Sequence, residues 1–273
     1  MISTPQLRRP AIVSPAADKA FKELLRRTFA ESVPWEDQYL EHEMAHFAHV
    51  LRAGLCPTAG SVMLEFGCNI GATSIVLAHA GAAVVACDVS TAYLALAQLN
   101  ANRYGVLNAV RLLQIAETGA LPFKDGAFDA VICNSVLEYV QPTQLQNTLR
   151  ELDRVLAPGG HLVIWGTSNR LWPVEAHSRR WLANYVPRAF DRFLRKPLQR
   201  GLWPWELQRA RSSYDDVLHQ LEPAQYLEAR GVSQAGGLRE LALTVGSSLC
   251  RMLGVHADFV TPWLVAVCRK RQP

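Results

Sequence analysis

Residues 62–78, VMLEFGCNIGATSIVLA, read as an apolar strand that runs through a tight glycine turn directly into a helix. Glu65 lies at the end of the strand, and Gly67 and Gly71 allow the backbone to approach a ligand closely. The free amides of a helix that begins near Ala72 would face a carboxylate or a phosphate. The glycine spacing alone does not select one chemistry, because several classes of nucleotide-binding fold use this arrangement.

Strand and helix patterns alternate after this segment. The expected strands are 61–66, 83–87, 110–115, 128–133 and 161–166, and the expected helices are 72–80, 90–104 and 142–156. Turn residues agree: Ser90 is placed as an N-cap, Gly105 follows a helix end, Asp125-Gly126 suits a turn, and 158–160 separates the last helix from its strand. The alternation predicts an α/β fold with a parallel sheet covered by helices.

Less regular segments flank this core. Residues 16–54 look helical with an interruption near Pro34, and 167–211 are irregular and rich in Arg, Trp and Pro. A helical pattern over 237–253 precedes an apolar run, 262–268, which we expect as a final strand on the sheet edge. We divide the chain into an N-terminal helical lid, a cofactor-binding core, an inserted cap and a C-terminal completion of the sheet: 1–54, 55–168, 169–212 and 213–273.

Composition indicates an ordinary globular enzyme. The 273 residues are 49% hydrophobic with a formal net charge of +4, and neither end carries the lysine-rich block of a nucleic-acid-binding tail, so nucleic acid is not expected as a partner. The six cysteines form no CxxC pair, which predicts free thiols in a reduced compartment. The first thirty residues lack a signal-peptide core, and the longest apolar run, 74–87, is too short to cross a bilayer. We expect a cytoplasmic protein, and the sequence indicates no oligomeric state.

Two acidic residues follow strand ends beside the glycine turn. Asp88 ends the second strand, 17 positions after Gly71, and suits a pair of ribose hydroxyls. Its alternative role, capping the next helix, is already filled by Ser90. Glu117 follows the third strand and, with the amide of Thr118, suits an exocyclic amine such as that of adenine; the alternative is a solvated loop carboxylate.

Four sequence blocks in this order resemble the class I S-adenosylmethionine-dependent methyltransferases, particularly the branch that includes the quinone-biosynthesis methyltransferases. The blocks are EFGCNIG at 65–71, ACDVS at 86–90, ETGALPFKDGAFDAVICNSVLEYV at 117–140 and RVLAPGGHLVI at 154–164. The resemblance implies a doubly wound, seven-stranded mixed sheet of Rossmann-like type with strand order 3-2-1-4-5-7-6. It makes an NAD(P)-dependent oxidoreductase the less favoured reading.

The resemblance also implies S-adenosylmethionine as the cofactor. The amino acid portion would face Glu65 and the turn, the ribose Asp88, the adenine Val89 and Glu117, and the methionine side Asn134. The full implied set is Glu65, Phe66, Gly67, Cys68, Asn69, Gly71, Asp88, Val89, Glu117, Thr118 and Asn134. Asn69 replaces the usual middle glycine of this family, but asparagine tolerates a left-handed backbone. Tyr139 stands where many relatives carry histidine and receives no role from its position.

Methyl transfer to a hydroxyl requires a base as well as alignment. His177, on the insertion after the fifth strand, is the candidate catalytic residue, and a solvated or structural histidine is the alternative. An oxygen atom of a small-molecule or lipid- or sugar-linked acceptor is therefore the expected target, while nitrogen and carbon acceptors remain open. A non-catalytic cofactor-binding scaffold is a further alternative.

The insertion mixes tryptophan and arginine. It contains four tryptophans and ten basic residues but only three acidic ones. Such a segment could bind an anionic amphiphile, a membrane surface or single-stranded nucleic acid. The alternative is a packed cap whose arginines are solvated. We expect Arg170 and Trp172 at the substrate. Trp35 and Tyr39 either close over the substrate or attach the N-terminal helix to the core.

Residues 42–46, HEMAH, match the pattern of zinc proteases. Leu40 and Met44 belong to an apolar stripe, and a step of about 100° per residue places His42 and His46 near the opposite face. We therefore expect no metal site, and a zinc hydrolase remains the least favoured alternative.

Overall fold

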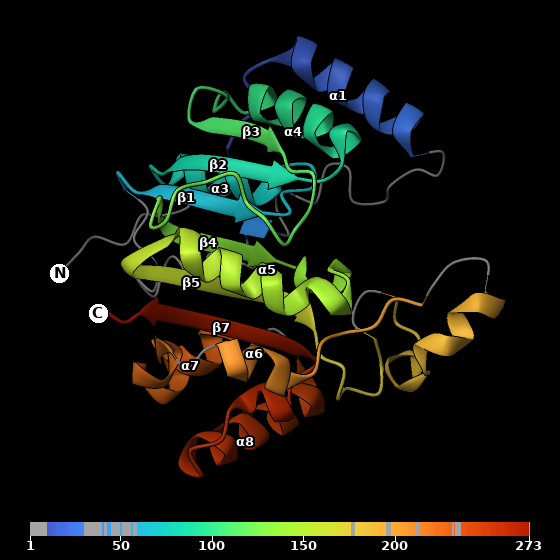
Figure 1. The fold of residues 1–273 in the computed structure, drawn as a ribbon, viewed down its shortest axis with the longest axis vertical. Helices are drawn as coiled ribbons and strands as arrows, with labels where there is room; N and C mark the ends of the chain where they lie inside the picture. The colour runs from blue at the N-terminus through green and yellow to red at the C-terminus, as the bar shows by residue number, and fades with distance from the viewer. Residues whose placement is uncertain are drawn as a thin grey trace.

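The computed structural model describes residues 10–29, 40, 43–44, 50, 56, 59–175, 178–194, 198–210, 213–230, 232 and 236–272. Within these residues one mixed sheet has the order β3-β2-β1-β4-β5-β7-β6, as expected (Figure 1). The strands are β1 Val62–Phe66, β2 Ala83–Asp88, β3 Val110–Gln114, β4 Phe128–Asn134, β5 Leu156–Ser168, β6 Tyr214–Asp216 and β7 Trp263–Lys270. The α-helices are α1 Pro15–Thr28, α3 Ala72–His79, α4 Thr91–Arg103, α5 Pro142–Val155, α6 Pro204–Ala210, α7 Pro223–Ala229 and α8 Gly237–Met252.

Both faces of the sheet are buried. Alternate residues of the same strands enter two separate cores: Met63 and Ile132 pack on one face, and Leu64 and Val131 pack on the other. Side chains of a strand alternate between faces, so near-continuous apolar strands are what a sheet covered on both sides requires. The sequence pattern of β1, β2 and β4 therefore led to the correct fold class.

The position of the last strand was predicted wrongly. β7 does not lie on the edge of the sheet: it pairs antiparallel with β5 on one side and with β6 on the other. Five consecutive buried residues, 264–268, are typical of an interior strand. The edge strand β6 has only three residues, Tyr-Asp-Asp, and this polar run carries no strand periodicity that sequence analysis could detect.

β5 also begins earlier than expected. Leu156 already pairs with Phe128, and the register then shifts so that the next pair is His161 with Ala130. Residues 157–160 therefore lie opposite the single residue Asp129, three more than a regular pairing would contain, and Gly159 adopts a φ of 77° there. The Pro-Gly-Gly sequence marks a β-bulge in this strand and does not form a separate turn before it.

The other expected helix and turn signals are confirmed. The Ser90 hydroxyl accepts a hydrogen bond from the Tyr93 N–H at 3.3 Å and caps α4. Gly105 after this helix and Gly126 in the predicted turn have φ values of 70° and 62°. All six cysteines lie in described residues, are buried and form no disulfide, as predicted.

The described parts of the N-terminal segment pack on the core. α1 lies against α4 (Figure 1), where Arg103 forms an ion pair of 2.6 Å with Asp18 and its guanidinium lies 4.3 Å from the Phe21 ring centroid. Leu40 and Val50, further along the segment, join the main core. The division into lid, core, cap and C-terminal part stays a prediction. In the part of the chain that the structure describes, no helix has the length and apolarity needed to cross a membrane.

Candidate functional site

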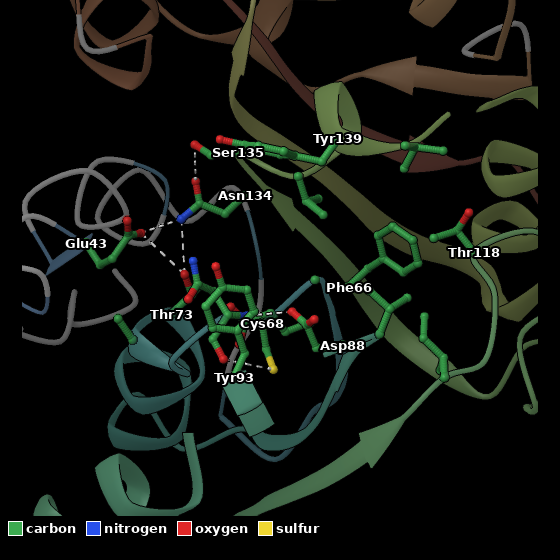
Figure 2. A pocket seen from close by; sticks show the side chains of 18 of the residues that line it. Glu43, Phe66, Cys68, Thr73, Asp88, Tyr93, Thr118, Asn134, Ser135 and Tyr139 are labelled. Atoms are coloured by element: carbon green, nitrogen blue, oxygen red, sulfur yellow. Dashed lines mark hydrogen bonds between the residues drawn. The ribbon is translucent and has the colours of Figure 1, made fainter. Parts of the chain in front are cut away.

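A cavity of about 820 Å³ lies at the carboxyl ends of β1, β2 and β4, where α3 begins (Figure 2). The edge of a doubly wound sheet at which its strand order reverses is the usual ligand site of such folds. The described residues that line the cavity are Glu43, Glu65, Phe66, Gly67, Cys68, Asn69, Ala72, Thr73, Asp88, Val89, Tyr93, Ile115, Thr118, Asn134, Ser135, Val136, Tyr139, Val140 and Arg179.

The glycine turn is built from left-handed residues. Gly67, Asn69 and Gly71 have φ values of 74°, 50° and 76°, so the expectation that asparagine accepts this conformation is confirmed. The Gly67 and Cys68 amides each donate to the Cys87 carbonyl at 2.9 Å, which ties the turn to the end of β2. The side-chain carbonyl oxygen of Asn69 is buried and has no hydrogen-bond partner among the described residues.

Asp88 is held by backbone amides. One carboxylate oxygen accepts from the Asn69 N–H at 3.0 Å and the other from the Ser90 N–H at 2.9 Å. Each carboxylate oxygen can accept a second hydrogen bond, so Asp88 retains acceptor capacity toward the cavity. Asp88 can therefore both hold the start of the next helix and accept hydrogen bonds from ribose hydroxyls, the two roles weighed from the sequence.

Two buried carboxyl groups occupy the end of the cavity next to α3. Glu43 accepts hydrogen bonds from the Thr73 hydroxyl at 3.3 Å and from the Asn134 side-chain amide, while Glu65 accepts one from the Ser74 hydroxyl. Burial raises the pKa of Glu43 to about 7, although its two donors act in the opposite direction. Burial, assisted by the nearby Glu43 charge, raises the pKa of Glu65 to about 8.

Sequence analysis did not assign Glu43 to the site. We treated it only as part of the zinc-protease-like segment, whose residues His42 and His46 lie outside the described residues. Leu40 and Met44 are buried as the apolar stripe predicts, but Glu43 is buried beside them. The sequence does carry a signal for the burial of Glu43. A helical step of about 100° per residue places Glu43 only about 60° from Leu40, at the margin of the apolar stripe. Within the described chain, no cluster of three or more metal-ligating side chains is present.

Most of the expected cofactor-binding residues meet in the cavity. Nine of them line it: Glu65, Phe66, Gly67, Cys68, Asn69, Asp88, Val89, Thr118 and Asn134. Gly71 lies outside the lining, at the start of α3, where an added Cβ would lie 3.1 Å from the Ala97 Cβ. Glu117 is exposed and also lies outside it, which favours the alternative of a solvated loop carboxylate.

Of the expected substrate residues, the two that the structure describes, Arg170 and Trp172, do not line the cavity. The Arg170 guanidinium lies 4.9 Å from the Trp203 ring centroid within the cap, and Trp172 uses its carbonyl to accept from the Asn184 side chain at 2.8 Å. His177, Trp35 and Tyr39 lie outside the described residues. The cap residue that does line the cavity is Arg179, which sequence analysis did not single out.

The lining changes character along its length. Figure 2 shows Glu43, Thr73 and Asn134 at one end, Phe66 and Thr118 at the other, and Asp88 between them. The first end offers buried carboxylate and amide groups, and the second offers an aromatic ring. Such a gradient suits an elongated ligand with a cationic or zwitterionic end and a flat, less polar end.

Comparisons with known proteins agree with this geometry. A protein family described as a methyltransferase domain matches residues 64–164. A demethylmenaquinone methyltransferase of Tropheryma whipplei is 32% identical over 144 residues, which are 53% of this chain and 57% of the relative, so the chain spans little more than half the length of that protein. A ubiquinone biosynthesis O-methyltransferase of Pseudomonas paraeruginosa is 31% identical over 182 residues, 62% of this chain and 75% of the relative.

The fold is shared with solved structures. An S-adenosylmethionine-dependent methyltransferase from Mesorhizobium loti superimposes with a TM-score of 0.52 at 19% identity, covering 83% of this chain and all of that one. At this level of identity the likeness concerns the fold alone. It agrees with the strand order and the mixed sheet described above.

Proposed function

Because the chain belongs to the class I S-adenosylmethionine-dependent methyltransferases, we propose that its cavity binds S-adenosylmethionine and that the protein methylates an oxygen atom of a small-molecule acceptor. The observation that carries this proposal is the ordered lining, with Glu43 and Asn134 at one end, Asp88 in the middle and Phe66 at the other end. A nicotinamide cofactor would not require buried carboxylates at one end of its site.

The lining residues fit this donor. Glu43 is suited to the methionine ammonium, Asp88 to the ribose hydroxyls, and the apolar Phe66 and Ile115 to the adenine ring. The buried, unpartnered side-chain oxygen of Asn69 is a further acceptor available to a ligand with donor groups. The donor, when bound, supplies a methyl group on a sulfonium that is already electrophilic.

The protein then has to orient the acceptor and exclude water. Tyr93, Val136 and Tyr139 contribute apolar and aromatic surface to the cavity, which suits an acceptor with an aromatic body. The two relatives support this class, since one is a ubiquinone biosynthesis O-methyltransferase and the other is a demethylmenaquinone methyltransferase. We therefore place the acceptor hydroxyl on a ring of phenol or quinol type.

His177 is our proposed base for that hydroxyl. The supporting observation is its place in the chain, two positions before Arg179, which lines the cavity. Imidazole titrates near neutral pH and suits this proton transfer. Replacing His177 with alanine should lower kcat at least tenfold and leave the Kd for S-adenosylhomocysteine unchanged. His256→Ala, whose imidazole lies 3.5 Å from Asp216 and outside the cavity lining, is the matched control.

Two measurements test the proposed function. Calorimetry should detect binding of S-adenosylhomocysteine and none of NADH. Transfer of a labelled methyl group should occur to a catechol or hydroquinone and not to matched anilines. Binding of NADH without binding of S-adenosylhomocysteine would refute the cofactor assignment. If the label appeared on the anilines and not on the phenols, only the oxygen acceptor would be refuted.

A further inference from the structure

The arginine- and tryptophan-rich cap divides into a packed base and an exposed tip. In the base, Arg200 is fully buried and its guanidinium donates to both carboxylate oxygens of Asp191, at 2.8 and 2.9 Å. The rings of Trp203 and Trp205 stack with centroids 4.7 Å apart. For Arg200 and Trp203 the packed-cap alternative weighed from the sequence describes the structure, whereas Trp205 is 41% exposed at the margin of the base.

The tip, residues 178–194, is different because it exposes large apolar side chains. Trp181 is 75% exposed and Phe193 is 70% exposed. The full exposed apolar set of the tip is Trp181, Leu182, Tyr185, Phe190, Phe193 and Leu194. Burying such side chains in the core would be favourable, so their joint exposure on one short segment points to a function outside the folded core.

Arginines alternate with this apolar set along the tip sequence. Arg179, Arg180, Arg188 and Arg192 are all exposed, and the Arg192 guanidinium lies 4.6 Å from the Phe193 ring centroid. Asp191 is the only acidic residue of the tip sequence, and it is engaged by the buried Arg200. The tip therefore combines aromatic side chains with an excess of positive charge.

We propose that this tip is a docking surface for an anionic lipid bilayer. Tryptophan, tyrosine and phenylalanine favour the membrane interface, and each arginine near an anionic surface adds electrostatic attraction. The tip lies beyond the carboxyl ends of the parallel strands, at the right of Figure 1. A second copy of the chain fits less well, because symmetric contact would bring the arginines of two tips together.

The tip also adjoins the cavity. Arg179 belongs to the tip sequence and lines the cavity at the same time. Docking would therefore bring the cavity close to the bilayer surface. This inference does not require the proposed reaction, because lipid binding can be measured without a donor or an acceptor.

The test is co-sedimentation of the full chain with two kinds of vesicle, one of phosphatidylcholine alone and one of phosphatidylcholine mixed equally with phosphatidylglycerol. The wild type should bind the anionic vesicles and lose that binding in high salt. The double variants Arg180→Glu/Arg192→Glu and Trp181→Ser/Phe193→Ser should each lower the partition coefficient by roughly tenfold or more. Retained binding of S-adenosylhomocysteine would report an intact core in these variants.

The matched control is the other exposed apolar surface, the outer side of α8. Leu241 and Val245 are 59% and 50% exposed there, and the double variant Leu241→Ser/Val245→Ser should bind vesicles like the wild type. Loss of binding in this variant, or undiminished binding in both tip variants, would overturn the proposal. A dimer that the tip variants abolish, without any vesicle binding, would assign the tip to self-association instead.

A second measurement covers the case in which a tip variant does not fold. Brominated anionic lipids should quench the tryptophan fluorescence of the wild type, and the conservative variant Trp181→Phe should lose most of that quenching. Equal quenching in the wild type and in Trp181→Phe would place the contact elsewhere and contradict the proposal.

Discussion

The carboxylate of Asp88 accepts a hydrogen bond from the backbone amide of Asn69 at 3.0 Å. This bond joins the end of β2 to the left-handed middle of the glycine turn. Two sequence signals separated by 19 residues, an acidic strand end and a glycine-rich turn, thus form one unit at the cavity. The acidic residue both orients the turn and retains acceptor capacity for a ligand.

Replacing Asp88 with asparagine should weaken binding of S-adenosylhomocysteine by roughly tenfold or more, since a hydrogen bond to a charged group is worth about 1.5–3 kcal/mol. Calorimetry measures the loss. The matched control is Asp129→Asn: Asp129 also accepts from a backbone amide, that of Val62 at 2.8 Å, but lies at the amino end of the sheet. Equal loss of affinity in both variants would indicate general destabilisation.

Replacing Gly67 with alanine should destabilise the protein more than the same change at Gly60. Both glycines have a φ of 74°, so each change costs about 1 kcal/mol in backbone strain. At Gly60 the added Cβ meets nothing within 4 Å, whereas at Gly67 it would overlap the Val136 side chain. We expect roughly 2 kcal/mol of additional loss at Gly67, measured by urea unfolding. Val136→Ala in the Gly67→Ala background should restore part of it, and no restoration would argue against the clash.

Replacing Glu43 with glutamine should weaken binding of S-adenosylmethionine by roughly tenfold, because the substitution removes the negative charge that suits a cationic ligand. The effect should grow as the pH rises through about 7, where the pKa of Glu43 lies. Glu138→Gln is the control, since Glu138 is also buried but does not line the cavity. An identical Kd in wild type and Glu43→Gln at pH 8 would remove Glu43 from the donor site.

The two buried carboxyl groups should make the ligand-free protein less stable as the pH rises. The pKa values of Glu43 and Glu65, about 7 and about 8, lie above the ordinary 4.5, so the folded state binds more protons than the unfolded state. The stability attached to these groups is therefore fully present below pH 4.5 and is lost as the pH rises toward 8. The double variant Glu43→Gln/Glu65→Gln should show a flatter decline between pH 5 and pH 8 in urea unfolding. Parallel curves would contradict the raised pKa values.

Features encoded within a few consecutive residues were predicted correctly. The β1 strand, the glycine turn and α3 follow from local periodicity and from backbone conformations that glycine and Asn69 accept. The Ser90 cap follows from one side chain reaching an amide three residues away. The site residues that end β1, β2 and β4 were predictable because parallel strands bring their carboxyl ends to one edge of the sheet.

The hydrogen-bond partners of Glu43 and its place in the cavity required the tertiary structure. Its hydrogen-bond partners Thr73 and Asn134 lie 30 and 91 residues further along the chain, and no local pattern reports such a contact. The HEMAH motif directed attention to the histidines, although the glutamate is the residue whose carboxylate reaches the cavity.

The sequence alone determined the alternation of strands and helices and the turn that faces the cavity, because those depend on short-range periodicity and backbone stereochemistry. The strand order and the cofactor class were implied by the resemblance of four sequence blocks to a known family. The tertiary structure decided that Glu43 enters the cavity and that the cap has a packed base and an exposed tip. In each case the deciding quantity is burial by residues distant in sequence. Burial depends on which surfaces meet, and composition alone does not specify that.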